Sequence, residues 1–143
     1  MKIFEVATMS RLLLGVFITV ALVSAGGCRT APIYNVSKAS LGLPPDTSLT
    51  IADVAKAVSV AGQKLGWQIE ETRPGEATGT LTVSDRHVAV VSITYDRSTF
   101  SLAYKDSKKL LQSGNMIHKE YNAWVHLLEV GIQREAQALT ASK

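Results

Sequence analysis

An uncharged apolar run near the N-terminus decides which part of this 143-residue chain can fold into a domain. Residues 12–25 are almost wholly apolar, Lys2 and Arg11 stand before them, and two glycines follow. A basic start, an apolar middle and a small-residue exit are the order of a secretory signal peptide. We therefore expect residues 1–27 to be removed and the fold to be made by the residues that follow.

A transmembrane helix is the alternative interpretation of this segment, and such a helix needs about 20 consecutive apolar residues. The uncharged stretch between Arg11 and Arg29 only just reaches that length, and its two glycines suit an extended, protease-accessible segment better than a helix end. Glu5 is unusual in the basic part of a signal, whereas a start at Met9 would exclude it. The sequence leaves the start open between Met1 and Met9.

Cys28 is the only cysteine of the chain and follows the two glycines directly. A lone cysteine cannot form an internal disulfide, and no neighbouring histidine is present to activate the thiol. The stretch Leu22–Cys28 resembles the lipobox of bacterial lipoproteins, in which small residues precede a cysteine that is lipidated and becomes the mature N-terminus, although Ala25 stands where that class usually has leucine. The resemblance implies cleavage between Gly27 and Cys28 and an acyl anchor on Cys28. An ordinary signal exit at residues 25–27 and a free thiol are the alternatives.

The residue after this cysteine bears on where such a lipoprotein would be held. Arg29 occupies the position at which an aspartate tends to retain lipoproteins in the inner membrane. The resemblance therefore implies the outer membrane, with the protein on its periplasmic face and the membrane as its partner through lipidated Cys28. Each buried acyl methylene contributes about 0.8 kcal/mol, so a cysteine with several acyl chains is a stable anchor.

The charge of the chain is nearly balanced once the signal is removed. The sequence has 15 Lys and Arg against 12 Asp and Glu, and two basic residues and one acidic residue precede Cys28, which leaves 13 against 11. The charges are interspersed and aromatic residues are few, so we expect no nucleic-acid partner. One local basic cluster consists of Lys105, Lys108 and Lys109. It is either a solvated loop or a contact with anionic headgroups beside the anchor.

Two parts are expected after the signal. Residues 28–46 contain three of the four prolines and show no sustained periodicity, so we expect a flexible, lipid-anchored tether. Residues 47–143 are expected to form a single α+β domain. A helix is predicted over residues 51–65, because Thr50 and Asp53 fit a capping box and apolar side chains recur with helical spacing. Gly66 then suits the left-handed position after a helix.

A second helix is predicted over residues 116–139, with Asn115 as its cap. Gly131 lies in its middle, where glycine costs about 1 kcal/mol against alanine. We expect it to mark a close approach to the first helix or to the sheet. The apolar face of this helix is expected to consist of Ile117, Tyr121, Trp124, Leu128, Ile132 and Leu139.

Between the helices, apolar and polar residues alternate in four stretches separated by short turns, which predicts antiparallel strands. Pro74 and Gly75 suit a type II turn between the first two stretches. The sequence thus predicts a two-layer α+β fold in the order α-β-β-β-β-α, a four-stranded antiparallel meander with two helices on one face. The face under the helices is expected to carry the large side chains Trp67, Ile69, Leu81, Val83, Val91, Ile93, Tyr95, Phe100, Leu102 and Tyr104.

The opposite face of this meander would be small, β-branched and almost uncharged at its centre. An antiparallel sheet can expose one face to water. Val88, Val90 and Ala103 are nevertheless apolar for an exposed face, and apolar patches often mark contacts. The face would be made of Thr80, Thr82, Val88, Val90, Ser92, Thr94, Ser101 and Ala103.

The sequence contains none of the short motifs that carry catalysis or bind metals, such as HExxH, CxxC, GxSxG or a glycine-rich phosphate loop. His118 and His126 are eight residues apart on a predicted helix, about 12 Å by helical rise, and cannot share a small ion. His126 with Glu129 makes half a site at most. We expect no catalytic residue, no metal and no cofactor.

A second resemblance comes from the C-terminal half. Ile117–Val125 reads Ile-His-Lys-Glu-Tyr-Asn-Ala-Trp-Val and follows a strand with a Tyr-x-x-Ser pattern at Phe100–Ser107. Together they resemble a group of small secreted or lipid-anchored proteobacterial proteins over roughly residues 65–132. The group has no assigned activity, so the resemblance implies a fold and a location only. The positions it singles out are His118, Tyr121, Asn122 and Trp124.

Two functions follow as hypotheses. The first is a binding or scaffold module that docks another envelope component through an exposed strand edge or through the open sheet face at Val88, Val90 and Ala103. The second is a small-ligand or enzymatic site in a notch formed by Tyr104, His118 and Asn122. For His118 and Asn122 the structural alternative is a clamp that ties the helix start to the loop after the last strand. Sequence leaves the partner and the oligomeric state open.

Overall fold

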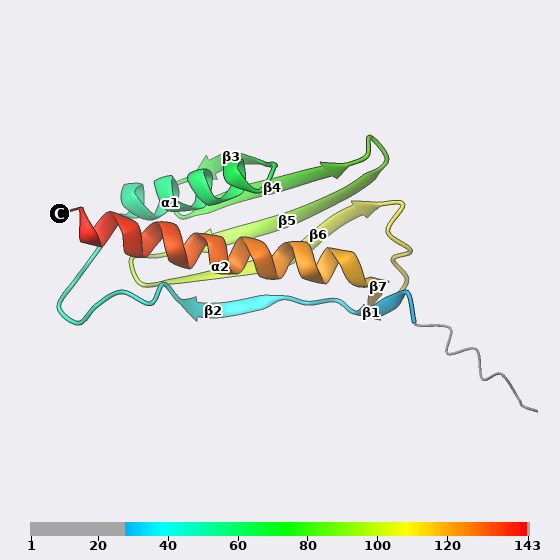
Figure 1. Cartoon of the computed structure of the whole chain (residues 1–143), viewed down its shortest axis with the longest axis horizontal. Coiled ribbons are helices and arrows are strands. Elements are labelled where there is room, and N and C mark those ends of the chain that lie inside the picture. Colours follow the sequence, from blue (N-terminus) through cyan, green and yellow to red (C-terminus); the bar gives the residue numbers. More distant parts are fainter. Residues whose placement is uncertain (1–27, 143) are drawn as a thin grey trace, which may run out of the picture.

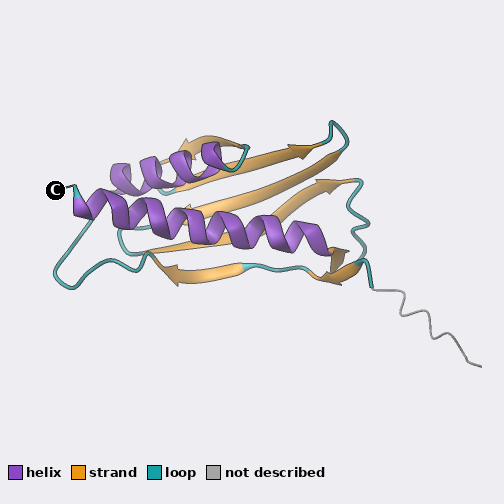
Figure 2. Cartoon of the chain, viewed as in Figure 1, coloured by secondary structure: helices purple, strands orange, loops and turns teal. Residues whose placement is uncertain are grey.

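The structure is a computed structural model that describes residues 28–142, and Figure 1 shows its elements. Two helices lie side by side on one face of a twisted antiparallel sheet, and the other face is left uncovered (Figure 2). The elements in chain order are β1 (Thr30–Pro32), β2 (Val36–Ser40), α1 (Ile51–Lys64), β3 (Trp67–Arg73), β4 (Glu76–Val83), β5 (His87–Tyr95), β6 (Thr99–Lys108), β7 (Met116–His118) and α2 (Lys119–Ala141).

The first helix forms where its sequence signals predict it. The Thr50 hydroxyl accepts a hydrogen bond of 3.0 Å from the Asp53 backbone N–H, and the Asp53 carboxylate accepts one of 3.0 Å from the Thr50 backbone N–H. This reciprocal pair satisfies two amides that a helix start leaves unpaired. Gly66 has a φ of +83°, so the chain leaves the helix through the left-handed conformation that glycine adopts without strain.

The second helix starts later than the sequence predicts. Residues 116–118 form β7, α2 begins at Lys119, and the cap is His118 rather than Asn115. The prediction was wrong there because Met116 and Ile117 pair with Pro32 and Ala31 of β1, and sequence alone did not reveal that distant partner. Ile117 is buried as predicted, but from a strand.

The predicted α+β architecture is confirmed, whereas the strand count and order differ. The four-stranded meander β3-β4-β5-β6 is present, and β2 adds a fifth strand beside β6, giving the order β2-β6-β5-β4-β3. β1 and β7 form a separate two-stranded sheet. All strand pairs are antiparallel.

The segment expected to be a tether carries two of these strands. In residues 28–46, β1 pairs with β7 and β2 pairs with β6. Leu41 is fully buried, and its backbone N–H donates to the Ser98 carbonyl at 2.9 Å. The expectation of a flexible tether over this segment is therefore not met, and within residues 28–142 regular structure begins at Thr30, two residues after Cys28.

The core lies between the sheet and the helices. The large-residue face of the meander points to the helices as predicted, since seven of its ten residues are buried and Ile69, Val83 and Tyr104 pack against them. From α2 the core takes Tyr121, Leu128 and Ile132, and from α1 Val54 and Val58. The sequence reasoning overlooked Leu41, Leu49 and Leu110, which are buried in connections.

Neither helix of residues 28–142 is long and apolar enough to cross a membrane. Three predictions fall outside the described residues: the signal peptide, Gly27 as the residue before the cleavage site, and the start at Met1 or Met9.

Candidate functional site

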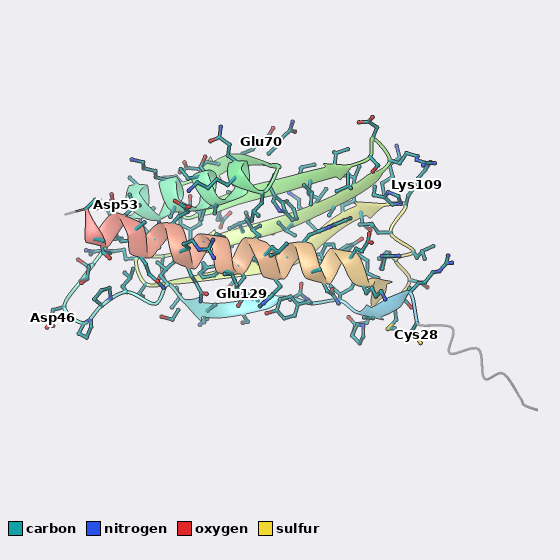
Figure 3. The ribbon with its side chains drawn as sticks, in the orientation of Figure 1. Cys28, Asp46, Asp53, Glu70, Lys109 and Glu129 are labelled. Carbon is teal, nitrogen blue, oxygen red and sulfur yellow. The ribbon has the colours of Figure 1, made fainter. Side chains whose placement is uncertain are left out.

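Cys28 lies exposed at one end of the long axis of the domain, next to the start of β1 (Figure 3). The backbone carbonyl of the following residue, Arg29, accepts a hydrogen bond of 2.9 Å from the N–H of Lys119. Thr30 is then in register with His118. The chain is therefore fixed to the start of α2 within two residues of the cysteine.

A loop from Lys109 to Asn115 lies at the same end (Figure 1). The Leu110 carbonyl accepts from the His118 N–H at 2.8 Å, and the Asn115 carbonyl accepts from the Ile33 N–H at 2.9 Å. Leu110 is itself buried. These contacts join the loop, β7 and the N-terminal strand into one unit beside Cys28.

The His118 N–H ties the helix start to Leu110 in the loop after β6, whereas the side chains of His118 and Asn122 have other partners. The His118 Nδ1 accepts from the Glu120 N–H at 3.3 Å and so caps α2. The Asn122 side chain accepts from the Tyr34 N–H at 2.9 Å and donates to the Pro32 carbonyl at 2.8 Å. Asn122 therefore clamps the N-terminal segment to α2 and does not bind the loop after β6.

A second contact between the same segments was missed by the sequence reasoning. The Tyr34 hydroxyl donates to the Glu129 carboxylate at 2.7 Å, and the same carboxylate oxygen lies 3.1 Å from the His126 Nδ1. The Glu129 hydrogen bond is the main cause that raises the pKa of Tyr34, with burial second. The spacing of His126 and Glu129 was visible in the sequence. Tyr34 was not expected to contact them, because it lies in the segment predicted to be a flexible tether.

A solvent-open groove of about 540 Å³ runs beside this contact. It is lined by Pro32, Ile33, Tyr34, Asn122 and His126. The sequence predicted a notch with Tyr104, His118 and Asn122 around one opening. The groove in the structure has a different lining, because Asn122 faces the N-terminal segment.

Tyr104 lies on the core side of β6. Its ring packs edge-to-face on Tyr121 with 5.7 Å between centroids, and its hydroxyl is 3.0 Å from the Ser107 Oγ. The Tyr121 ring is fully buried, and its hydroxyl has no hydrogen-bond partner among residues 28–142. Burial raises the pKa of Tyr121, with the neighbouring Tyr104 a smaller cause.

The open sheet face carries the other three predicted binding residues. Val90 is opposite Thr80 on β4, and Ser92 is opposite Ala103 on β6. Val88 and Val90 are half-buried, and Ala103 is exposed. No helix of the described chain covers this face (Figure 2). Val88, Val90 and Ala103 therefore lie on the same surface, the open face of the sheet. They occupy its centre and the part toward one end.

The three lysines of the predicted cluster do not stay together. Lys105 lies at a bulge of β6, and its Nζ donates to the Thr78 Oγ1 on β4 at 3.0 Å, across the open face. Lys108 ends β6 and Lys109 begins the loop beside Cys28. Of the three lysines, only Lys108 and Lys109 lie at the end of the domain that carries Cys28.

Within residues 28–142 no group of three or more His, Cys, Asp or Glu side chains is placed to hold a metal ion. Comparison with models of protein families, with curated proteins and with solved structures found no match to this chain.

Proposed function

We propose that the protein is an outer-membrane lipoprotein, held on the periplasmic side by lipidated Cys28, that acts as a binding or scaffold module for another envelope protein. The observation that carries the binding role is the uncovered face of the five-stranded sheet, with half-buried Val88 and Val90. The location rests on the lipobox resemblance and on Arg29 after the cysteine.

The exposure of Cys28 supports the anchor. The cysteine precedes the first strand by two residues, so nothing in the described chain covers it. A lipidated cysteine must keep its acyl chains in the bilayer while the domain stays in water, and a position at the end of the domain meets both needs.

The direction of the strands relative to Cys28 supports the docking face. The strands of the large sheet run lengthwise, from the end that carries Cys28 to the opposite end (Figure 1). With that end on the membrane, the sheet stands away from the bilayer and its open face points sideways. A neighbouring protein in the same compartment can then approach it.

The chemistry of the face suits a protein better than a small ligand. Small and β-branched side chains of β4 and β5 form its centre, and β6 adds charged groups: Asp106 is opposite Val90, Lys108 is opposite Val88, and Lys105 reaches Thr78 across the face. An antiparallel sheet that merely faces water is usually polar on that side. Half-buried valines can bury further against a partner, at about 25 cal/mol for each Å² of apolar surface.

We propose binding rather than catalysis, because the polar groups of the predicted notch are already used inside the fold. The side chains of His118, Asn122 and Tyr104 each make an intramolecular hydrogen bond. A ligand or substrate at these groups would have to compete with contacts that hold α2 and the N-terminal segment.

The anchor is tested by the intact mass of the protein extracted from the membranes of its host. The proposal predicts a chain that begins at Cys28 and carries acyl groups, and a Cys28→Ser variant that leaves the membrane fraction. A mature chain with an unmodified Cys28 thiol would contradict the anchor.

The docking role is tested by the size of the native complex in gentle detergent extracts. Val90→Lys places a charge on the open face, from which lysine can still extend to water without unfolding the sheet. The control is Gln63→Lys on the exposed side of α1. We expect Val90→Lys, and not Gln63→Lys, to reduce the complex to the size of the lone protein. Complexes of unchanged size for both variants would contradict the docking role.

A further inference from the structure

Exposed apolar side chains of residues 28–142 gather in two places. Leu65, Leu127 and Val130 lie on the helices, whereas Leu111 and Met116 lie at the end that carries Cys28. Leu111 is 58 % exposed, more than any of the other four. A leucine this exposed on a short loop next to a lipid-anchor position needs a reason.

The backbone holds Leu111 in this exposed position. Its φ is +53° and that of Lys109 is +57°, left-handed conformations that side chains other than glycine, asparagine and aspartate seldom adopt. Between them Leu110 is buried, and its carbonyl accepts from the His118 N–H. Burial of Leu110 and strain on either side thus direct Leu111 outward. Strained, non-glycine conformations of this kind concentrate at functional positions.

Four cationic residues, Arg29, Lys108, Lys109 and Lys119, lie at the same end of the molecule as Leu111. Lys108 and Lys109 precede Leu111 in the chain, and the Arg29 carbonyl binds the Lys119 N–H beside β7. All four side chains are exposed, and none forms an ion pair within residues 28–142. The acidic neighbours are Asp106, Glu120 and, in the β4–β5 turn, Asp85, so the end keeps a positive balance.

The distance from Cys28 to this end is short. One residue separates Cys28 from β1, and an extended chain spans about 3.5 Å per residue. β1 is in register with β7, which is bonded to the loop through Leu110. Figure 3 places Cys28 and Lys109 at the same end of the domain. Acyl chains on Cys28 would therefore bring this end to the surface of the bilayer.

We propose that this end is a membrane seat: Leu111 and Met116 insert into the headgroup region of the bilayer that holds Cys28, and Arg29, Lys108, Lys109 and Lys119 contact anionic phospholipid headgroups. The proposal rests on the lipid anchor proposed above and adds an orientation to it. An apolar side chain inside a basic rim is the pattern that binds the interface of an anionic membrane. The seat keeps the long axis upright and the open sheet face turned sideways.

The single cysteine makes a direct test feasible. Acylation consumes the Cys28 thiol, so a cysteine added elsewhere is the only point that a thiol reagent can label. The full-length lipidated chain with Leu111→Cys is reconstituted into vesicles of phosphatidylethanolamine and phosphatidylglycerol and labelled with a polarity-sensitive fluorophore. Leu127→Cys on α2 is the matched control, because Leu127 is 54 % exposed but lies outside the seat.

We expect the label at position 111 to shift to shorter wavelength and to be quenched by a quencher attached to lipid, and the label at position 127 to do neither. Replacing phosphatidylglycerol by phosphatidylcholine, or raising the salt to about 1 M, should weaken the quenching at 111, since the cations are screened. Adding Lys109→Asn should weaken it as well, without strain, because asparagine tolerates the left-handed conformation.

The outcomes separate the seat from the anchor. Equal signals at 111 and 127, in protein that stays with the vesicles, would overturn the seat and leave the anchor standing. Quenching at 111 that ignores lipid charge, salt and Lys109→Asn would overturn the contact with headgroups. Release from the vesicles, or labelling of the parent chain at Cys28, would overturn the anchor on which the seat depends.

Discussion

The side-chain oxygen of Asn122 accepts a 2.9 Å hydrogen bond from the backbone N–H of Tyr34, which joins two residues 88 positions apart. The amide group of the same side chain donates to the Pro32 carbonyl at 2.8 Å. One asparagine on α2 thus satisfies two backbone groups in the connection between β1 and β2. This clamp keeps the residues after Cys28 on the domain.

Asn122→Ala should lower the free energy of unfolding by about 1–2 kcal/mol, because it leaves the partly buried N–H of Tyr34 without its partner and removes the exposed bond to the Pro32 carbonyl. Asn122→Asp should recover part of the loss, since a carboxylate still accepts from Tyr34. Urea denaturation of the three proteins measures this. Equal stability of the alanine variant and the parent would show that the connection is held by other contacts.

Two helical glycines should respond in opposite ways to alanine. A Cβ on Gly62 would overlap Ile69 Cγ1, whereas one on Gly131 would meet Leu65 Cδ1 at 3.3 Å and Ala61 Cβ at 3.5 Å. We expect Gly62→Ala to cost about 1–3 kcal/mol through overpacking. Gly131→Ala should be neutral or gain up to about 1 kcal/mol from helix propensity. Thermal unfolding measures both, and a stabilised Gly62→Ala would contradict the packing of α1 on β3.

Asp96 should make the β5–β6 turn sensitive to acid. Its carboxylate accepts from the backbone N–H groups of Ser98 at 2.8 Å and Thr99 at 2.7 Å, and these bonds lower its pKa from 3.8 to about 2. A lowered folded-state pKa adds stability that is present above the unfolded pKa and is lost as the pH falls through the folded one. Asp96→Ala should therefore lower the urea midpoint at neutral pH, and the difference from the parent should shrink as the pH falls from about 4 to about 2, where the charged form is lost.

Asp96→Asn is the control, because its amide oxygen still accepts the two backbone bonds. Its urea midpoint should lie between those of the parent and Asp96→Ala at neutral pH. A difference between the parent and Asp96→Ala that stayed constant from neutral to acid pH would show that the charge of Asp96 adds nothing.

Tyr121→Phe should be neutral or stabilising, although Tyr121 is among the largest buried side chains. Its hydroxyl has no hydrogen-bond partner among residues 28–142, and an unpaired buried hydroxyl costs about 1–3 kcal/mol. Phenylalanine keeps the edge-to-face contact with Tyr104. Chemical denaturation of the two proteins tests this, and a clear loss of stability in the phenylalanine variant would mean that the hydroxyl is bound.

Local signals were enough to predict most of the fold. The capping box at Thr50, the positive φ at Gly66 and the alternation from Trp67 to Tyr104 are written in neighbouring residues, and the structure confirms them. A Cβ on Gly131 would contact Ala61 of α1 and Leu65 directly after it, so the two helices approach closely there, as the place of this glycine in the helix predicts.

The features that the sequence did not reveal, namely the two N-terminal strands and the contacts of Asn122, depend on residues far away in the chain. β1 has three residues and pairs with β7, and β2 has five and pairs with β6 across a bulge. Segments this short carry too little propensity to stand out, and the prolines near them favoured a tether. The hydrogen bonds of Asn122 to Pro32 and Tyr34 depend on that pairing. The sequence therefore indicated Asn122 as a position of interest but did not reveal these two partners. The open face was predictable as a pattern, whereas its use and the lipid anchor at Cys28 stay proposals.

The most direct test of the docking role places a photo-reactive amino acid at Val90 in the lipidated, full-length protein in its host, with Gln63 on α1 as the control position. We expect one discrete protein adduct from Val90 and none from Gln63. We also expect Thr80→Lys, opposite Val90 on β4, to remove the adduct while the protein stays folded. No adduct from Val90, or the same adducts from both positions, would contradict the claim that the open sheet face docks a partner.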